Sequence, residues 1–441
     1  MNSPLLNDLL DALNAPQARL AELHRYATGT QRQAFLSEES RKALDSQLYR
    51  LAVNIPALSV SSLCERLRIH GYSDPRATEL FTRTDLDQLA TQAMSDALTY
   101  GTGYVLVWAK NGKLVASVED PSQCAVLKDP ADRSVLAGIK RYQTASTTEV
   151  YIYLADEVQH WSAPTKGGVT YALVETIPNP TGMVPLIPID NGRSELDDLR
   201  GPVDALNKVI LCMLVGVHRA GFGRSWVTGL ELTERPILDG AGNPLYDDEG
   251  NPLVEVVSPI DDLSTLPMAI AEAPDTKFGN FNEPTLGGFE TAVRVLVSQI
   301  MAVSALPSHY LGILTSQPTS ADAVRASEAS LVARVEQRQL TFGRAWEQVG
   351  RLLLAIDTNT DTADMPLRVT WAPADTRSEA QVSDSVTKLV QSGILPVSYA
   401  LRRLGYSERE ITDILAARES EIASGMRADI QRYTNATIQN G

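Results

Sequence analysis

The stretch from Ser320 to Asp357 reads SADAVRASEASLVARVEQRQLTFGRAWEQVGRLLLAID and contains no proline. Apolar residues recur through it at helical spacing and share one face; they are Val324, Leu331, Val335, Phe342, Trp346, Val349, Leu353 and Ile356. This pattern predicts one uninterrupted helix, which at ~1.5 Å per residue spans roughly 55 Å. A helix of that length is more typical of a brace in a large assembly than of an element inside a compact enzyme.

A second apolar helix is predicted directly before it, over FETAVRVLVSQIMAVSALP at residues 289–307. Pro307 should end this helix, because proline lacks an amide donor and clashes with the preceding turn. The polar segment SHYLGILTSQPTS then connects the two helices. Thr319 and Asp322 have the spacing of a capping box, which indicates that the long helix begins at a defined point.

The rest of the chain divides by pattern. The first ~100 residues show mainly helical periodicity, and residues 104–190 contain β-branched and aromatic runs separated by turn residues. A strict three-four spacing of apolar residues from Leu196 to Val217 predicts another helix. A short strand is expected at 366–372, and helices return from Ser378. The fold class is therefore α+β.

Residues 229–285 differ from the rest in charge. They hold twelve acidic and two basic residues, a net charge of −10 within a chain whose total is −15. Gly-Asn-Pro-Leu occurs twice, at 242–245 and 250–253, which indicates consecutive hairpin turns. We expect a small exposed β-module inserted between two helices.

Composition excludes several classes of protein. The acidic balance argues against a simple basic nucleic-acid binder, and three widely separated cysteines (Cys64, Cys124 and Cys212) exclude a disulfide framework. No basic, apolar leader opens the chain, and the longest apolar run, Val209 to Val217, is far shorter than the ~20 residues that span a bilayer. A soluble intracellular protein, with no membrane partner, is expected.

The search for catalytic chemistry is mostly negative. The sequence has no P-loop and no G-x-S-x-G elbow, its five histidines lack metal-ligand spacing, and Gly101-Thr-Gly103 precedes a strand rather than a helix. Asp247-Asp248-Glu249 invites a calcium interpretation, but the loop that starts at Asp239 has Pro244 and Gly250 where an EF-hand needs glycine and glutamate. A solvated acidic turn is favoured, no cofactor is expected, and a divalent-metal hydrolase using this triplet stays an alternative.

Six segments in this order resemble the portal proteins of tailed bacteriophages with long non-contractile tails. They are VSSLCERLRIHGY (60–72), ALTYGTGYVLV (97–107), GMVPLIP (182–188), VSALPSHYLG (303–312), RASEASLVARVEQRQLTFGRAWEQV (325–349) and KLVQSGILPVSYALRRLG (388–405). Each segment is weak alone, but together they touch nearly the whole chain. An acidic β-insert between two amphipathic helices adds to the resemblance.

The resemblance implies a portal-type fold and a non-enzymatic role. A ring of about twelve subunits would surround a DNA channel at one capsid vertex, dock the terminase motor and later the head–tail connector, and contact major capsid and scaffolding proteins. The implied regions are an α/β N-terminal wing (1–195), a first stem helix (196–228), a clip (229–285), a second stem helix (286–307), a tunnel loop (308–321), the long wing helix and strand (322–377) and a helical crown (378–441).

The same resemblance assigns candidate residues. Thr315, Ser316, Gln317, Thr319 and Ser320 would face DNA in the tunnel loop, and this loop contains no Lys or Arg. Neutral hydrogen-bonding groups avoid the strong phosphate attraction that lysines create, so DNA could slide.

Outside the loop, Arg294 would line the channel or form an ion pair between subunits. One face of the long helix carries charges of both signs and would suit contacts between subunits, with a solvated surface as the alternative; its residues are Arg325, Glu328, Arg334, Glu336, Arg338 and Glu347. The clip would dock partners through Asp239, Asp247, Asp248 and Glu249. A plain head–tail adaptor ring without the loop is a further alternative.

Overall fold

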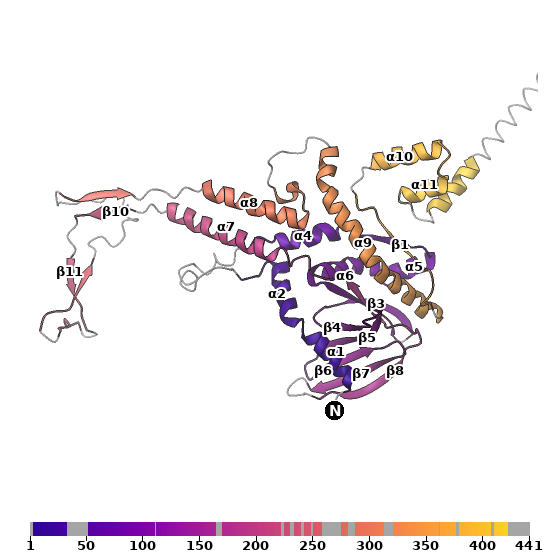
Figure 1. The fold of residues 1–441 in the computed structure, drawn as a ribbon, viewed down its shortest axis with the longest axis horizontal. Coiled ribbons are helices and arrows are strands. Elements are labelled where there is room, and N and C mark those ends of the chain that lie inside the picture. The colour runs from indigo at the N-terminus through magenta and orange to yellow at the C-terminus, as the bar shows by residue number, and fades with distance from the viewer. Residues whose placement is uncertain are drawn as a thin grey trace, which may run out of the picture. The chain divides into compact units, whose positions relative to one another are not determined.

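The computed structural model describes most of the chain, in two compact units, Met1–Ala372 and Pro373–Gly441 (Figure 1). The described residues are 3–32, 52–110, 112–164, 170–221, 225–229, 233–239, 242–247, 250–257, 275–280, 287–312, 321–360, 362–375, 379–406 and 410–421. Five helices occupy the described part of the first hundred residues, as predicted: α1 Pro4–Asn14, α2 Gln17–Thr28, α4 Ile55–Cys64, α5 Pro75–Arg83 and α6 Leu86–Tyr100.

A five-stranded antiparallel sheet has the order β4-β5-β6-β7-β8. Its strands are β4 Cys124–Lys128, β5 Val135–Gln143, β6 Thr147–Tyr153, β7 Glu157–Pro164 and β8 Ala172–Pro178. Leu6, Leu9 and Leu13 of α1 are fully buried against one face of this sheet, among Ile139, Val150 and others. The β-branched and aromatic runs of the sequence cover β5, β6 and β8. They missed β4, which is short and has one β-branched residue, and β7, whose polar residues dilute the alternating pattern.

A three-stranded antiparallel sheet, β3-β2-β9, contacts both α6 and the long helix. Its strands are β2 Thr102–Lys110, β3 Lys113–Glu119 and β9 Leu186–Asp190. Gly101 ends α6 in the left-handed conformation, with φ +97°. A Cβ on Gly103 would lie 2.2 Å from the carbonyl oxygen of Ala93, so the strand can approach α6 only because this residue is glycine. The two glycines thus serve a tight helix-to-strand connection.

The long helix is observed as α9, Ala321–Thr358, which confirms the prediction of one uninterrupted helix. Phe342 and Trp346 on it are fully buried. The ring of Phe81 meets Trp346 edge-on with centroids 6.1 Å apart, and the Tyr72 hydroxyl donates a hydrogen bond to the Trp346 carbonyl oxygen at 3.0 Å. Strand β1, Ile69–Tyr72, pairs with β14, Val369–Trp371, beside α9. The helix is therefore the central core element of this unit.

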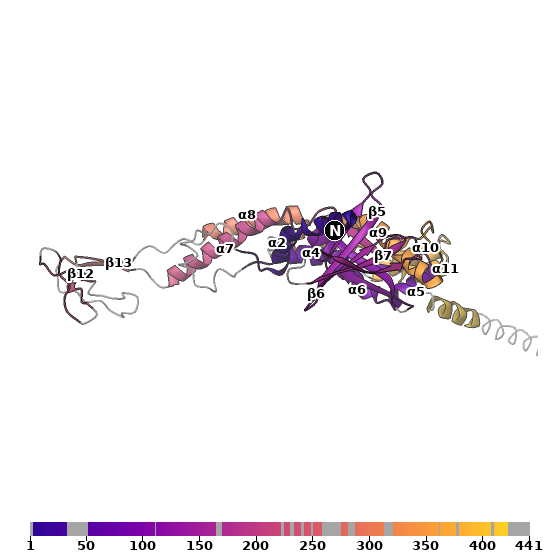
Figure 2. The same ribbon diagram turned by 90° about the horizontal axis from the view of Figure 1, so that it is seen from below.

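Two helices flank the acidic module: α7, Arg200–Gly221, and α8, Gly287–Ser304. They pack together and lie side by side in both views (Figures 1 and 2). Helix α7 is shorter than the predicted first stem helix, because 195–199 form turns and 225–228 form a strand. Helix α8 ends three residues before Pro307, where Ala305 takes a φ of +58°. A 3-10 turn, η2 Ser308–Leu311, follows.

The described parts of the acidic module are β, as expected. Strand β10 (Ser225–Thr228) pairs with β13 (Lys277–Asn280), and β11 (Thr233–Pro236) pairs with β12 (Val254–Val257).

The second unit contains α10, Glu379–Gln391, which packs with α11, Val397–Arg403. Residues 410–421 are also helical. Residues 407–409 and 422–441 lie outside the described residues.

Replacing Gly103 with Ala should destabilise the first unit by about 2 kcal/mol or more, because the added methyl group meets a backbone carbonyl rather than a movable side chain. Thermal unfolding of the purified chain measures this. Gly201→Ala is the matched control, since a Cβ there meets nothing within 4 Å. Equal melting temperatures for the two variants would contradict the close approach of β2 to α6.

Candidate functional site

Arg294, the predicted channel cation, lies on α8 one turn after Glu290. Its Nη2 is 2.7 Å from the Glu290 Oε1, and both side chains are mostly exposed. Such a pair within a helix contributes little to stability in water. That Arg294 lines a channel, or pairs with a neighbouring subunit, stays a prediction.

The tunnel-loop candidates Thr315, Ser316, Gln317, Thr319 and Ser320 lie outside the described residues, and the prediction for them stays a prediction. The segments on either side of the loop are described. They meet at the buried carboxylate of Glu328, which belongs to α9, the helix that follows the loop. Arg66 Nη2 is 3.0 Å from Glu328 Oε2, and His309 Nε2 is 3.5 Å from Oε1. Arg66 also donates to the Tyr310 hydroxyl at 3.1 Å. We call Arg66, His309, Tyr310 and Glu328 the loop-base cluster.

Burial and charge act in opposite directions in the loop-base cluster. Burial alone would lower the pKa of Arg66, but its hydrogen bond to Tyr310 and the charge of Glu328 outweigh burial and raise that pKa. The arginine therefore stays charged where it holds the start of α9 against η2. Sequence reasoning missed this cluster, because Arg66 belongs to a helical region far from the loop in the chain and no motif links it to Glu328.

A second carboxylate, that of Glu195, lies just before α7 with its side chain 9% exposed, and it contacts two arginines of α9. Arg338 forms an ion pair with Glu195 and donates to its Oε1 through Nε at 3.0 Å. Arg334 Nη1 lies 3.7 Å from Glu195 Oε2, and its Nη2 donates to the Val303 carbonyl oxygen at the end of α8 at 3.0 Å. These contacts connect the entry of α7 and the exit of α8 to the same two turns of α9.

The charged face of α9 is therefore mainly an internal face of the subunit. The sequence suggested that Arg325, Glu328, Arg334, Glu336, Arg338 and Glu347 suit contacts between subunits. Glu328 and Glu347 are instead buried. Four of the six form ion pairs within the same chain. Glu328 pairs with Arg66, Arg334 and Arg338 pair with Glu195, and Glu347 Oε1 lies 3.4 Å from Arg368 Nη1.

In the acidic module, the carboxylates of Asp239 and Asp247 stabilise turns. Asp239 Oδ1 accepts the backbone N–H of Asn243 at 2.9 Å, and Asp247 Oδ1 accepts that of Asn251 at 2.8 Å. Asp248 and Glu249 lie outside the described residues. Within the part of the chain that the structure describes, no group of three or more His, Cys, Asp or Glu side chains could hold a metal ion. The geometry of Asp239 and Asp247 gives no support to a metal-dependent hydrolase.

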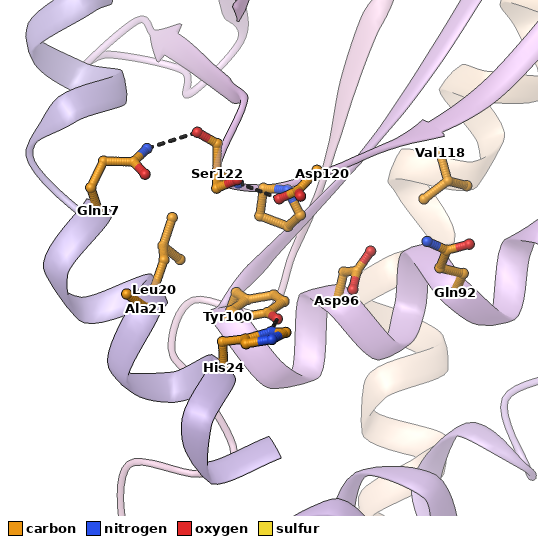
Figure 3. Close-up of a pocket in the computed structure, with 11 residues that line it drawn as sticks. Gln17, Leu20, Ala21, His24, Gln92, Asp96, Tyr100, Val118, Asp120 and Ser122 are labelled. Atoms are coloured by element: carbon orange, nitrogen blue, oxygen red, sulfur yellow. Dashed lines mark hydrogen bonds between the residues drawn. The ribbon is translucent and has the colours of Figure 1, made fainter. Parts of the chain in front are cut away.

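A cavity of about 550 Å³ lies between α2, α6 and the turn that joins β3 to β4 (Figure 3). His24 Nδ1 and the Tyr100 hydroxyl are 2.9 Å apart at one end, and Gln17 donates to the Ser122 carbonyl oxygen at 2.8 Å across the other. Burial, and then the charge of Asp120, raise the pKa of Asp96 to about 7. None of the described lining residues is Lys or Arg, so nothing there offsets the two carboxylates.

A model of the family described as "Phage portal protein, SPP1 Gp6-like" matches residues 74–424. The chain belongs to this phage portal protein family. Among curated relatives it is 25% identical over 407 residues to the portal protein of Mycobacterium phage L5, covering 85% of this chain and 80% of the relative. The portal protein of Mycobacterium phage D29 gives the same identity and coverage.

Solved structures of a gene transfer agent also align with the chain. The chain aligns with one from the "virion of native gene transfer agent (GTA) particle" at 13% identity and a TM-score of 0.44, covering 88% of this chain and 93% of that one. A chain of the "neck of native GTA particle computed with C12 symmetry" gives 14% identity and a TM-score of 0.41, with 80% and 91% covered.

Family membership confirms the resemblance found in the sequence. This is a portal protein of a tailed phage, a structural component of the virion at the portal vertex of the capsid, and at the level of the family it is not an enzyme. None of the helices in the described residues is long and apolar enough to cross a membrane.

Glu195→Gln should destabilise the portal chain by about 2–4 kcal/mol, because Arg338 and Arg334 lose the carboxylate that compensates their partly buried charges. The matched control is Glu290→Gln, which breaks the exposed pair with Arg294 and should cost less than about 1 kcal/mol. Denaturant unfolding of both variants measures the difference. Equal effects would show that Glu195 does not fix α9 to the start of α7.

Asp96→Asn should stabilise the chain in alkaline solution only. In the folded chain the pKa of Asp96 is about 7, above the ~4 of an unfolded aspartate. The proton bound to Asp96 therefore stabilises the folded chain fully below pH ~4, and this stabilisation is lost as the pH rises through 7. Asparagine cannot ionise, and at pH 8.5 the variant should gain about 2 kcal/mol, or a few degrees in melting temperature. At pH 5 the gain should be much smaller.

The control for Asp96 is Asp87→Asn, which makes the same chemical change at an exposed position of the same helix. A melting-temperature difference for Asp96→Asn that stays constant from pH 5 to 8.5 would contradict the raised pKa.

Proposed function

We propose that this portal protein assembles into a closed ring of about twelve copies and that the ring conducts double-stranded DNA during packaging and ejection. In this proposal residues 1–195 and 322–377 form the wing, 196–228 and 286–307 the stem around the channel, and 308–321 the tunnel loop. Residues 229–285 form the clip and 378–441 the crown. Family membership over residues 74–424 supports the proposal.

The observation that carries the ring is the surface of the paired helices α7 and α8. Val217 of α7 and Val295 and Val303 of α8 are 37–52% exposed, although both helices pack against each other and their bases are held by Glu195 and Arg334. Exposed apolar side chains on a helix pair indicate a surface that another protein covers. Neighbouring copies in a closed ring would cover them in every subunit at once.

The charge of the chain suits a conduit that must not retain its cargo. The net charge is −15, and Arg294 on the stem is paired with Glu290. Because lysine and arginine contacts to phosphates release counterions and favour binding, a channel with few unpaired cations lets DNA move. The neutral residues Thr315, Ser316, Gln317, Thr319 and Ser320 would add hydrogen-bonding groups without a strong electrostatic hold.

The remaining partners follow from the proposed position. The clip would dock the terminase motor during packaging and the head–tail connector afterwards, and the wing and crown would contact major capsid and scaffolding proteins.

The structure favours neither of the two alternative functions, a divalent-metal hydrolase and a plain head–tail adaptor ring. Asp247 is engaged in a turn rather than open for metal binding, and the family match is to portal proteins rather than to adaptors.

Mass photometry of the purified full-length chain tests the ring. We expect a discrete species of about twelve times the subunit mass, and Val295→Asp should shift it toward smaller species because the charge would be buried between copies. Leu340→Asp on α9 is the matched control, since Leu340 is 80% exposed and outside the stem. A stable monomer of the unmodified chain under all conditions would contradict the proposal.

A further inference from the structure

The clip contains a three-fold repeat that extends the twofold Gly-Asn-Pro-Leu pattern. Proline, an aliphatic residue, an apolar residue and an acid recur every eight residues, as Pro-Ile-Leu-Asp at 236–239, Pro-Leu-Tyr-Asp at 244–247 and Pro-Leu-Val-Glu at 252–255. All three copies lie within the described residues. We call these twelve residues the three-arm junction.

The backbone closes this repeat into a circle. The N–H of Leu245 donates to the carbonyl oxygen of Ile237 at 2.8 Å, that of Leu253 to Leu245 at 2.7 Å, and that of Ile237 to Leu253 at 2.8 Å. Each hairpin arm thus starts from one residue of a hydrogen-bonded triangle. Identical positions of the three repeats play identical parts, which makes the junction a pseudo-threefold structure.

The prolines are paired in the same cyclic way. Pro236 lies opposite Val254 in the β11–β12 ladder, Pro244 forms a bridge with Leu238, and Pro252 forms a bridge with Tyr246. Since proline has no N–H, it leaves no donor unsatisfied at these edge positions. The turns beyond two arms are closed by the Asp239 and Asp247 carboxylates and by Gly242 and Gly250 at positive φ.

This construction leaves apolar side chains uncovered. The second and third residues of every repeat have side chains that are between 40% and 61% exposed. These six residues are Ile237, Leu238, Leu245, Tyr246, Leu253 and Val254. Backbone hydrogen bonds and side-chain caps hold the junction together, so these six side chains are not needed to build a core. Six large apolar groups exposed within one small module are typical of an interaction surface.

Charge identifies the kind of partner. Residues 233–257 contain six acids, Glu234, Asp239, Asp247, Asp248, Glu249 and Glu255, against one base, Arg235. A second copy of the clip would bring like charges together around the apolar centre, whereas a partner with a basic rim would neutralise them. Permanent interfaces also have more apolar centres than transient ones, which favours a partner that stays in the finished particle over a motor that leaves.

We propose that the three-arm junction is the docking surface for a second protein of the finished particle, one with an apolar centre and a basic rim. This rests on the proposed function, because it places the partner on the clip of a portal ring. Tyr246 and Leu253 would be inserted into that partner's apolar centre, and Glu255 would lie at the acidic rim.

The test uses particles assembled with the full-length chain carrying Tyr246→Ser and Leu253→Ser together. Mass photometry of the purified chain reports ring formation, and electron microscopy counts DNA-filled heads and the fraction of them that carry a neck and tail. We expect intact rings and filled heads, with roughly tenfold fewer heads joined to tails. Glu255→Lys should reduce joining more weakly, since a charge at the rim acts mainly on association.

Two controls separate loss of docking from loss of folding. Tyr246→Phe with Leu253→Met keeps the apolar surface and should restore joining, whereas Val174→Ser on β8, also an exposed apolar position, should have no effect.

Three outcomes would overturn the inference. Unchanged joining would show that the surface is not a docking site. Loss of rings in the serine variant alone would place the surface between copies of this chain. Filled heads replaced by empty ones would assign it to the packaging motor. Failure of the unmodified chain to form rings would instead contradict the proposed function.

Discussion

The arrangement of this portal subunit depends on a largely buried carboxylate, that of Glu195, and on the two α9 arginines that contact it. A charge removed from water is stable only when opposite charges and hydrogen bonds compensate it. Arg338 and Arg334 provide that compensation, and Arg334 also binds the carbonyl oxygen of Val303 at the end of α8. Because all three groups must meet, the entry of α7 and the exit of α8 have one permitted position against α9.

The loop-base cluster applies the same constraint further along α9. Glu328 holds Arg66 and His309, so the segments before and after the proposed tunnel loop are both tied to the body of the subunit. Phe342 and Trp346 bury the middle of the helix against Phe81 and Tyr72. These contacts fix α9 at its start and along its middle within the subunit. In the acidic module, by contrast, local backbone hydrogen bonds define the three-arm junction and leave its apolar side chains exposed.

Periodicity predicted the elements whose apolar residues repeat cleanly, including α9, α8 and the core of α7, and runs of β-branched residues predicted most strands. It missed β4 and β7, and it extended the first stem helix through 225–228, where Ser-Trp-Val-Thr favours a strand. The mixed-sign face of α9 was wrongly interpreted as outward, because a helical pattern cannot tell a solvated arginine from one that meets a buried glutamate. Arg66, Glu195 and Glu328 are distant in sequence, and only the fold brings each to its partners.

A cryo-EM reconstruction of the assembled ring would show where these contacts lie. We expect a closed ring in which α7 and α8 of every subunit surround the channel. The Glu195–Arg338 and Glu328–Arg66 pairs should be intact within each subunit, and the three-arm junctions should be uncovered at one end. A ring whose channel is lined by the five-stranded sheet, or one in which α9 exchanges these ion pairs between subunits, would contradict this expectation.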